Sequence, residues 1–206
     1  SSLQPQELTQ DLLSLWKDTR MCSHFHIPLQ SGNDSILYKM RRRYSAETYL
    51  KSVDQVRSAV SDASITTDVI VGFPGEKESH FEDTRKICDS VGFSDMHVFK
   101  FSSRPGTTAY YLKDNIDSEI KNERSSILID ISQKSFAKFR EAYDGREMEV
   151  LWEINSNTAV NEKSYSGLTN NYIRVKSNTL KAENSLEKVK LHFNTNNPYG
   201  PMDIKK

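Results

Sequence analysis

HFHIPLQSGNDSILYKMRRRY, residues 24–44, is the stretch of sequence that decides the fold. It begins with an apolar strand, turns at the polar corner Gln30-Ser31-Gly32, and continues into a predicted helix that carries three consecutive arginines, residues 41–43. A buried strand, a polar turn and a helix in this order form the first half of a βαβ unit. The stretch therefore predicts a parallel sheet with a polar corner at a strand end.

The neighbouring segments repeat this pattern at intervals of about 35 residues, the length of a βαβ unit. Apolar residues at helical spacing predict helices, and short β-branched runs predict strands. The predicted helices are residues 7–18, 45–60 and 78–91, and the predicted strands are residues 22–29, 65–71 and 96–101. Such alternation is typical of a parallel sheet covered by helices, and we expect its strands to be apolar on both sides. Both an open doubly wound sheet and part of a (β/α) barrel fit this pattern. Three strands are too few to complete either fold, so the sequence does not decide between them.

The pattern changes after a long predicted helix, which ends at Asp144-Gly145 because glycine commonly follows a helix C-terminus. Short strands separated by Asn, Ser and Gly then follow without helices between them, and the tail from residue 194 is expected to be loose. The helix covers residues 116–143, and the strands are residues 148–154, 164–169, 171–177 and 188–193. We therefore predict two domains, residues 1–144 and 145–206, the second a small β-barrel or sandwich.

The composition is that of a globular protein and limits the classes of function. The 28 basic and 28 acidic side chains cancel, and a zero net charge neither favours nor excludes nucleic acid as a partner. No apolar run reaches the roughly 20 residues that span a bilayer, and the N-terminus resembles no targeting segment, so we expect a cytoplasmic location and no membrane partner. The two cysteines, Cys22 and Cys88, form no CxxC motif and predict no metal or iron–sulfur site.

A polar or glycine-rich corner follows each strand of the predicted parallel sheet. The carboxyl ends of parallel strands share one rim, and ligands bind there. Glycine lets backbone N–H groups approach a ligand, while Gln, Ser and Thr offer neutral hydrogen bonds. The corners predict one ligand site, although ordinary βα turns have a similar composition and neither GxGxxG nor GxxxxGKS is present. They are residues 30–32 (QSG), 72–76 (GFPGE) and 102–107 (SSRPGT).

Two further features leave alternatives open. His24 and His26 are two residues apart on a strand and point to the same face. With Asp68 and His97 on neighbouring strands they could form the metal centre of a hydrolase, or they could be histidines satisfied by the protein itself, which is more common. The arginines at 41–43 could bind a phosphate or a carboxylate, or could be the solvated end of a helix.

The ordered motifs resemble one family. HFHIPLQSGNDSILYKMRRRYSAETYL (24–50), ITTDVIVGFPGEKESHFEDT (65–84) and HVFKFSSRPGTTAYYL (97–112) are similar to the second half of the radical S-adenosylmethionine (radical SAM) methylthiotransferases that modify tRNA. Cys22 and the MRRRY block are more similar to the MtaB branch, which acts on threonylcarbamoyladenosine beside the anticodon, than to the MiaB branch. The resemblance implies the C-terminal half of a partial (β/α) radical-SAM barrel.

The C-terminal part resembles the TRAM domain, a small RNA-binding β-barrel, in GREMEVLWE (145–153) and YSGLTNNYIRVKS (165–177). Tyr172, Arg174 and Lys176 are expected to alternate outward on one strand and to bind tRNA through stacking and phosphate contacts. The charge of this part alone is barely basic and leaves a plain structural barrel open.

S-adenosylmethionine is the cofactor that the resemblance implies. The first corner would contact its ribose or methionine part, the second would form the adenine side, and an arginine would meet its carboxylate or a tRNA phosphate. The expected cofactor-binding residues are Gln30, Ser31, Gly32, Arg43, Val71, Gly72, Phe73, Pro74, Gly75, Ser102 and Arg104, with Thr107 on the substrate side. No catalytic residue is indicated.

The chain departs from the family because it lacks the CxxxCxxC motif and the further cysteines that hold its two clusters. Radical generation needs an electron from a reduced cluster. We therefore expect [4Fe–4S] clusters in the full-length enzyme but not on this chain, which is interpreted as a C-terminal fragment that is inactive alone. Its open barrel edge is expected to meet the missing N-terminal half or another copy. A non-catalytic RNA-binding module on a truncated barrel is the alternative.

Overall fold

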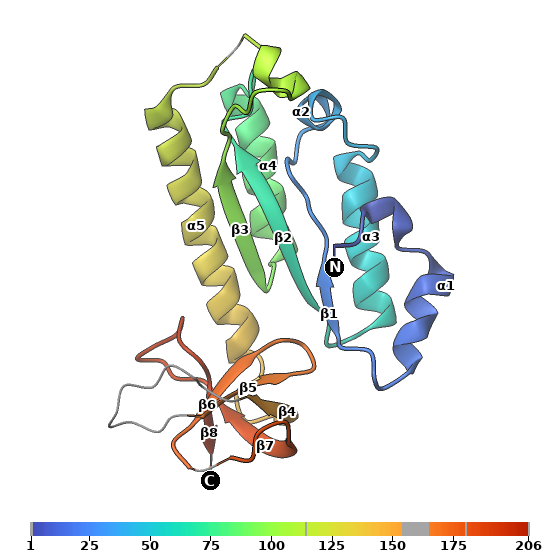
Figure 1. The fold of residues 1–206 in the computed structure, drawn as a ribbon, viewed down its shortest axis with the longest axis vertical. Helices are drawn as coiled ribbons and strands as arrows, with labels where there is room; N and C mark the ends of the chain where they lie inside the picture. Colours follow the sequence, from blue (N-terminus) through green and yellow to red (C-terminus); the bar gives the residue numbers. More distant parts are fainter. Residues whose placement is uncertain (1, 114, 154–164, 180, 206) are drawn as a thin grey trace.

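The chain forms a helix-covered parallel sheet and a small antiparallel barrel, connected by one long helix, α5 (Ser118–Glu141) (Figure 1). The computed structural model describes residues 2–113, 115–153, 165–179 and 181–205. The predicted strand ends at residues 154 and 164 lie outside the described residues. No helix in the described ranges is long and apolar enough to span a membrane.

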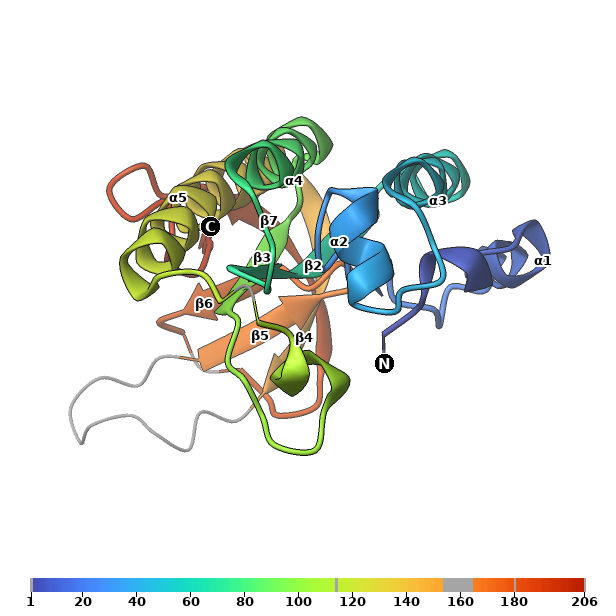
Figure 2. The ribbon, with the colours of Figure 1, turned by 90° about the horizontal axis from the view of Figure 1, so that it is seen from above.

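The first sheet confirms the predicted parallel arrangement. Its strands, in spatial order, are β1 (His24–His26), β2 (Ser64–Val71) and β3 (Asp95–Lys100). Helices α3 (Ala46–Ala59) and α4 (Glu78–Val91) connect them, and with α5 they form an arc over one face of the sheet (Figure 2). Ser45 caps α3 by accepting a hydrogen bond from Thr48 N at 3.1 Å, as its position before the apolar face predicts.

The two faces of this sheet differ in chemistry. On β2, Ile65, Val69 and Val71 are buried against the helices and belong to the main apolar core. Thr66 and Asp68 alternate with them and point to the other face, because successive strand residues point in opposite directions. That second face is polar and partly exposed within the described residues. Our expectation of strands apolar on both sides therefore holds for one face only.

The N-terminal segment differs from the single helix predicted for residues 7–18. It consists of η1 (Pro5–Glu7), the one-turn helix α1 (Gln10–Leu13) and η2 (Ser14–Lys17). Trp16 stacks on Phe25 with ring centroids 4.5 Å apart, and its indole N–H donates to Cys22 O at 2.9 Å. Tertiary contacts of one aromatic side chain thus outweigh the helical propensity of the segment.

The three arginines do not lie on a helix, so that prediction was wrong. Helix α2 (Asp34–Lys39) ends before them, and Arg41 adopts the left-handed conformation with φ 58°. Arg41 N donates to Tyr38 O and Arg42 N to Leu37 O, each at 2.9 Å. This is the hydrogen-bond pattern of a Schellman motif, which stops a helix.

The second sheet is antiparallel and nearly closes into a barrel. Its spatial order is β6-β5-β4-β7-β8, and a parallel bridge from Val175 to Met202 brings the two ends of the sheet together. Its strands are β4 (Glu147–Glu153), β5 (Tyr165–Thr169), β6 (Arg174–Ser177), β7 (Leu186–His192) and β8 (Asp203–Lys205). The tail predicted to be loose instead supplies β8, because the buried Met202 side chain anchors it in the barrel core.

The barrel contacts the amino ends of the parallel strands through specific polar groups. Arg146 Nη2 donates to both carboxylate oxygens of Asp62, at 3.0 and 3.0 Å, and Asn171 Nδ2 donates to Asp62 O at 3.4 Å. The rings of His24 and Tyr172 stack with centroids 4.1 Å apart. These contacts orient the barrel relative to the sheet.

We expect Asp62→Ala to loosen this junction without unfolding either part. The Asp62 and Arg146 side chains are 40% and 43% exposed, so the pair should contribute less than about 1 kcal/mol to the free energy of unfolding. Amide hydrogen exchange around Asn171 should nevertheless accelerate. Asp18→Ala is the matched control, because the Asp18 side chain is 42% exposed, close to the 40% of Asp62, and its ion pair with Arg20 is local. Unchanged exchange at the junction in the Asp62 variant would contradict the assignment.

Candidate functional site

The three corners predicted from the sequence come off adjacent strands at one rim, at the upper end of the sheet in Figure 1. Gln30 extends the β1–β2 ladder, since Gln30 N donates to Asp68 O at 2.8 Å and Ile70 N donates to Gln30 O at 2.9 Å. On the other side of β2, Phe101 N donates to Val71 O at 2.9 Å. The structure thus brings the residues after each strand to one edge.

The first corner is packed against α4 rather than open. Gly32 N donates to Thr84 Oγ1 at 2.9 Å, and the buried Ser31 hydroxyl lies 3.4 Å from the same oxygen. A Cβ on Gly32 would lie 2.6 Å from Thr84 Cα, so glycine is required there for packing. Gln30 has φ 64°, and its side-chain oxygen accepts from Arg42 Nη2 at 2.8 Å. Internal contacts therefore account for much of this corner.

The second corner is attached to α5 by a buried ion pair. The side chain of Glu76 accepts from Gly72 N at 2.7 Å and from Arg124 Nη1 at 2.8 Å. The second Arg124 nitrogen, Nη2, donates to Glu78 at 2.9 Å. Burial raises the pKa of the Glu76 carboxyl, while the Gly72 N–H and the Arg124 guanidinium act in the opposite direction. Left-handed Gly72 (φ 72°) and Gly75 (φ 79°) complete the turn.

Sequence reasoning missed Arg124. A signal existed, because Arg124 stands four residues before the buried Leu128 and seven before Ile131, at the spacing of the inward face of the helix. An arginine on that face needs an acidic partner, and the partner lies 48 residues away in the chain.

We expect Glu76→Gln to lower the free energy of unfolding by roughly 3 kcal/mol, because removing one member of a buried pair leaves the other charge uncompensated. Urea denaturation measures the change. Glu78→Gln is the matched control: it contacts the same arginine, but its side chain is 79% exposed, so its cost should stay below about 1 kcal/mol. Equal costs for the two variants would contradict the assignment.

The third corner and Arg43 present exposed side chains at the rim. Ser102, Arg104 and Thr107 are exposed, with Thr107 Oγ1 donating to Arg104 O at 2.8 Å. Arg43 is exposed in the turn between α2 and α3. Within the second corner Val71, Phe73 and Pro74 are buried, and Phe73 packs edge-to-face on Phe101 with centroids 5.1 Å apart. The pair forms an apolar wall beside the glycine turn.

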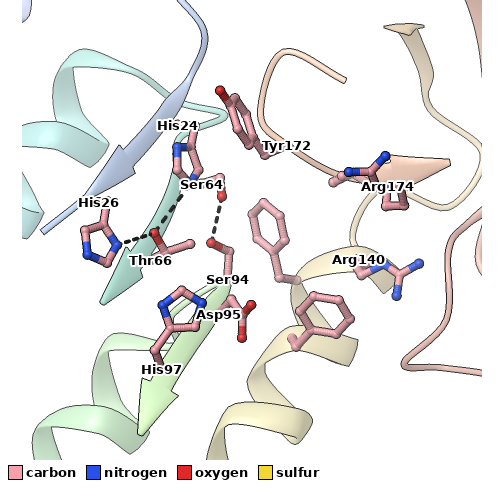
Figure 3. A pocket seen from close by; sticks show the side chains of 13 residues that line it. His24, His26, Ser64, Thr66, Ser94, Asp95, His97, Arg140, Tyr172 and Arg174 are labelled. Carbon is pink, nitrogen blue, oxygen red and sulfur yellow. Dashed lines mark hydrogen bonds between the residues drawn. The ribbon is translucent and has the colours of Figure 1, made fainter. Parts of the chain in front are cut away.

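A hollow of about 280 Å³ lies at the opposite end of the sheet, between the amino ends of the strands, α5 and the barrel (Figure 3). Thr66 Oγ1 lies 3.0 Å from His26 Nδ1 and 3.4 Å from His24 Nε2. The carboxylate of Asp68 lies between two rings, 3.3 Å from His26 Nε2 and 3.2 Å from His97 Nδ1. The histidines are thus satisfied by Thr66 and Asp68.

The hydrolase interpretation finds no support in this arrangement. Over residues 2–113, 115–153, 165–179 and 181–205, no group of three or more His, Cys, Asp or Glu side chains is placed to hold a metal ion. Cys22 is exposed ahead of β1 and Cys88 is buried on α4, where burial raises the pKa of its thiol to about 12. A buried thiol far from a second cysteine does not fit a cluster ligand.

The residues expected to bind RNA on the barrel are placed differently from the prediction. Tyr172 lies in the turn before β6, with φ 66°, and not on one strand with Arg174 and Lys176. Its ring covers His24. The guanidinium of Arg174 donates to the Glu153 carboxylate at 2.5 Å, and Lys176 Nζ lies 3.5 Å from Asp203 Oδ1. Both cations are therefore paired within the barrel.

The His24–Tyr172 contact predicts a pH dependence of stability. Burial, followed by the nearby His26, lowers the pKa of the His24 imidazole below 6.5 in the folded chain. The unfolded chain takes up this proton at higher pH than the folded chain, so the free energy of unfolding should fall as the pH drops from 6.5 toward the lowered value. His24→Phe keeps the stack and should flatten this fall in urea melts at pH 7.5 to 5. Tyr172→Phe, the control, should retain it, and an unchanged slope in His24→Phe would contradict the assignment.

The sequence of the chain is similar to those of radical SAM proteins. The sequence profile of the Radical SAM superfamily matches residues 2–88. The chain is 34% identical over 176 residues to the threonylcarbamoyladenosine tRNA methylthiotransferase MtaB of Bacillus subtilis, covering 85% of this chain and 39% of that protein. It is 40% identical over 152 residues to the tRNA-2-methylthio-N(6)-dimethylallyladenosine synthase of Thermobifida fusca, covering 73% of this chain and 31% of that protein.

A solved structure supports the fold. Coproporphyrinogen III oxidase (HemN) from Escherichia coli, a radical SAM enzyme, matches with a TM-score of 0.55 and 19% identity, over 65% of this chain and 31% of that chain. The curated relatives are also only partly matched, since the chain spans about a third of their length, from 31% to 39% in the two cases above.

Proposed function

Since this chain belongs to the radical SAM tRNA methylthiotransferases, we propose that it supplies the later strands of the radical SAM barrel and an RNA-binding barrel to such an enzyme. The enzyme would add a methylthio group to a modified adenosine beside the tRNA anticodon. The observation that carries the proposal is the 34% identity over 176 residues, a length that includes parts of both sheets. Cys22 and the MRRRY block favour threonylcarbamoyladenosine as the nucleoside.

The rim is the proposed cofactor site. The apolar pair Phe73–Phe101 beside the glycine turn suits one side of a purine, and exposed Ser102 and Arg104 can reach hydroxyl or carboxylate groups. Gln30 is held at this edge by Arg42. S-adenosylmethionine bound there would supply the radical chemistry of the superfamily. This chain's own residues would bind and orient it.

The cluster does not fit the residues of this chain. Of the two cysteines of this chain, Cys22 is exposed in the segment before β1, and Cys88 is buried on α4, where burial raises the pKa of its thiol. Our proposal therefore assigns the [4Fe–4S] cluster to cysteines outside this 206-residue sequence, in the same or another polypeptide. The polar face of the parallel sheet, with His26, Asp68 and His97, would then line the interior that the remaining barrel strands enclose.

The antiparallel barrel is the proposed TRAM-like module. Five short strands with nearly joined ends and a core around Trp152 agree with a small RNA-binding barrel. A tRNA substrate implies a cytoplasmic location.

Cofactor and RNA binding by the 206-residue chain test the proposal. Isothermal titration should detect S-adenosylmethionine binding that weakens when Arg104 is changed to Ala, because one cation at the rim is lost. Treated with iron and sulfide and reduced, the chain should not cleave the cofactor. Cleavage would overturn the assignment of the cluster to outside cysteines, and a chain that binds RNA but no S-adenosylmethionine would overturn the enzymatic assignment.

A further inference from the structure

A basic segment lies at the end of the molecule opposite the antiparallel barrel, where α2 ends and the turn to α3 begins (Figure 1). We call it the rim turn and define it as Lys39, Arg41, Arg42 and Arg43. The first three of these, with Tyr38, line a hollow of about 420 Å³ that has no acidic side chain in its lining. The rim turn directly adjoins the first corner of the proposed cofactor site, because Arg42 donates to Gln30.

The rim turn differs from β6 of the barrel in that no ion pair neutralises its charges. Among the described residues, no carboxylate forms an ion pair with any of its four cations, whereas Arg174 and Lys176 on β6 are paired with Glu153 and Asp203. An arginine already bound to a carboxylate must give up that contact to bind a phosphate. Unpaired cations therefore attract the phosphates of a nucleic acid more strongly than paired ones.

The backbone of the rim turn holds an arginine where helices usually place glycine. Arg41 occupies the left-handed position that follows the end of α2, with φ 58°. A side chain in this conformation is strained, and such strain concentrates at functional sites. Arg42, in contrast, turns inward, and its Nε is buried without a hydrogen-bond partner. The turn thus uses one arginine to anchor itself and presents its neighbours to solvent.

Exposed tyrosines accompany these cations on both sides of the rim. Tyr38 is 83% exposed next to Lys39. Beyond the third corner, η3 (Thr108–Tyr111) carries Tyr110 and Tyr111, and Tyr111 is 74% exposed. Exposed aromatic rings between cations are the surface that unpaired bases stack on, since every base has a π-face.

We propose that the rim turn, with Tyr38, is the main phosphate-binding surface of this chain for RNA and holds an unpaired RNA loop at the cofactor rim. The inference rests on the proposed function, which supplies RNA as the partner. It reverses the expectation that β6 of the barrel carries the phosphate contacts. The contacts that the barrel makes with Asp62 and His24 fix its position on the parallel sheet.

Salt-dependent binding of a synthetic anticodon stem-loop RNA, followed by fluorescence anisotropy, tests the proposal. Lys39→Gln/Arg41→Gln/Arg43→Gln should weaken binding about tenfold or more and reduce the slope of log K against log salt by about 2, because each lost phosphate contact removes roughly 0.7 to 0.9. Arg174→Gln/Lys176→Gln should change the affinity less than about threefold, because paired cations contribute little.

The matched control removes the same number of exposed charges elsewhere. Arg20, Lys51 and Lys134 are exposed and ion-paired, so Arg20→Gln/Lys51→Gln/Lys134→Gln should leave the affinity within about threefold. A further variant, Arg41→Gly, distinguishes loss of RNA binding from loss of folding. Glycine relieves the left-handed strain, so this variant should melt at the same temperature as the parent or higher and still lose RNA affinity.

The outcomes separate this inference from the proposed function. Loss of RNA binding in the β6 variant but not in the rim-turn variant overturns the inference and leaves the proposed function standing. Loss of S-adenosylmethionine binding without loss of RNA binding in the rim-turn variant assigns the cations to the cofactor carboxylate and also overturns it. A parent chain that binds no RNA, with S-adenosylmethionine binding intact, overturns the inference and the RNA part of the proposed function together.

Discussion

The buried ion pair between Arg124 and Glu76 is the contact on which the arrangement of this molecule depends. Two charges removed from water are tolerated only when they are paired, so the glycine corner after β2 and helix α5 must keep their relative position. The Glu76 carboxylate also holds the Gly72 backbone N–H, which fixes the shape of the corner. Helix α5 continues toward the antiparallel barrel, so this one ion pair fixes the position of the glycine corner relative to the helix that leads to the second sheet.

The two ends of the parallel sheet have different chemistry. At the amino ends, charges are paired and rings are stacked: Arg146 with Asp62, and His24 with Tyr172. Such contacts give fixed geometry and offer little to a ligand. At the carboxyl ends, the corners meet beside unpaired arginines and exposed tyrosines. This division agrees with a chain in which the barrel is positioned at one end and ligands are bound at the other.

The spacing of apolar and β-branched residues correctly predicted several helices and strands. The β-branched run at 65–71 is β2, and the apolar spacing at 78–91 is α4. The prediction failed where a distant contact decides. The tail became β8 because Met202 is buried in the barrel core, and residues 7–18 were divided because Trp16 packs on Phe25. The arginines lie outside the helix because a Schellman motif ends α2 before them. Glycine is the usual sequence signal of this motif, and here arginine occupies the left-handed position.

For the site, the sequence by itself determined which corners lie together, because parallel strands joined by helices must place all their carboxyl ends on one rim. Only the tertiary structure decided which side chains at that rim and on the barrel are available. Glu76 forms an ion pair with Arg124, and Arg174 forms one with Glu153. Among the described residues, Arg41 and Arg43 form no ion pair. Charge pairing depends on distances between residues far apart in the chain, and composition and periodicity carry no information about those distances.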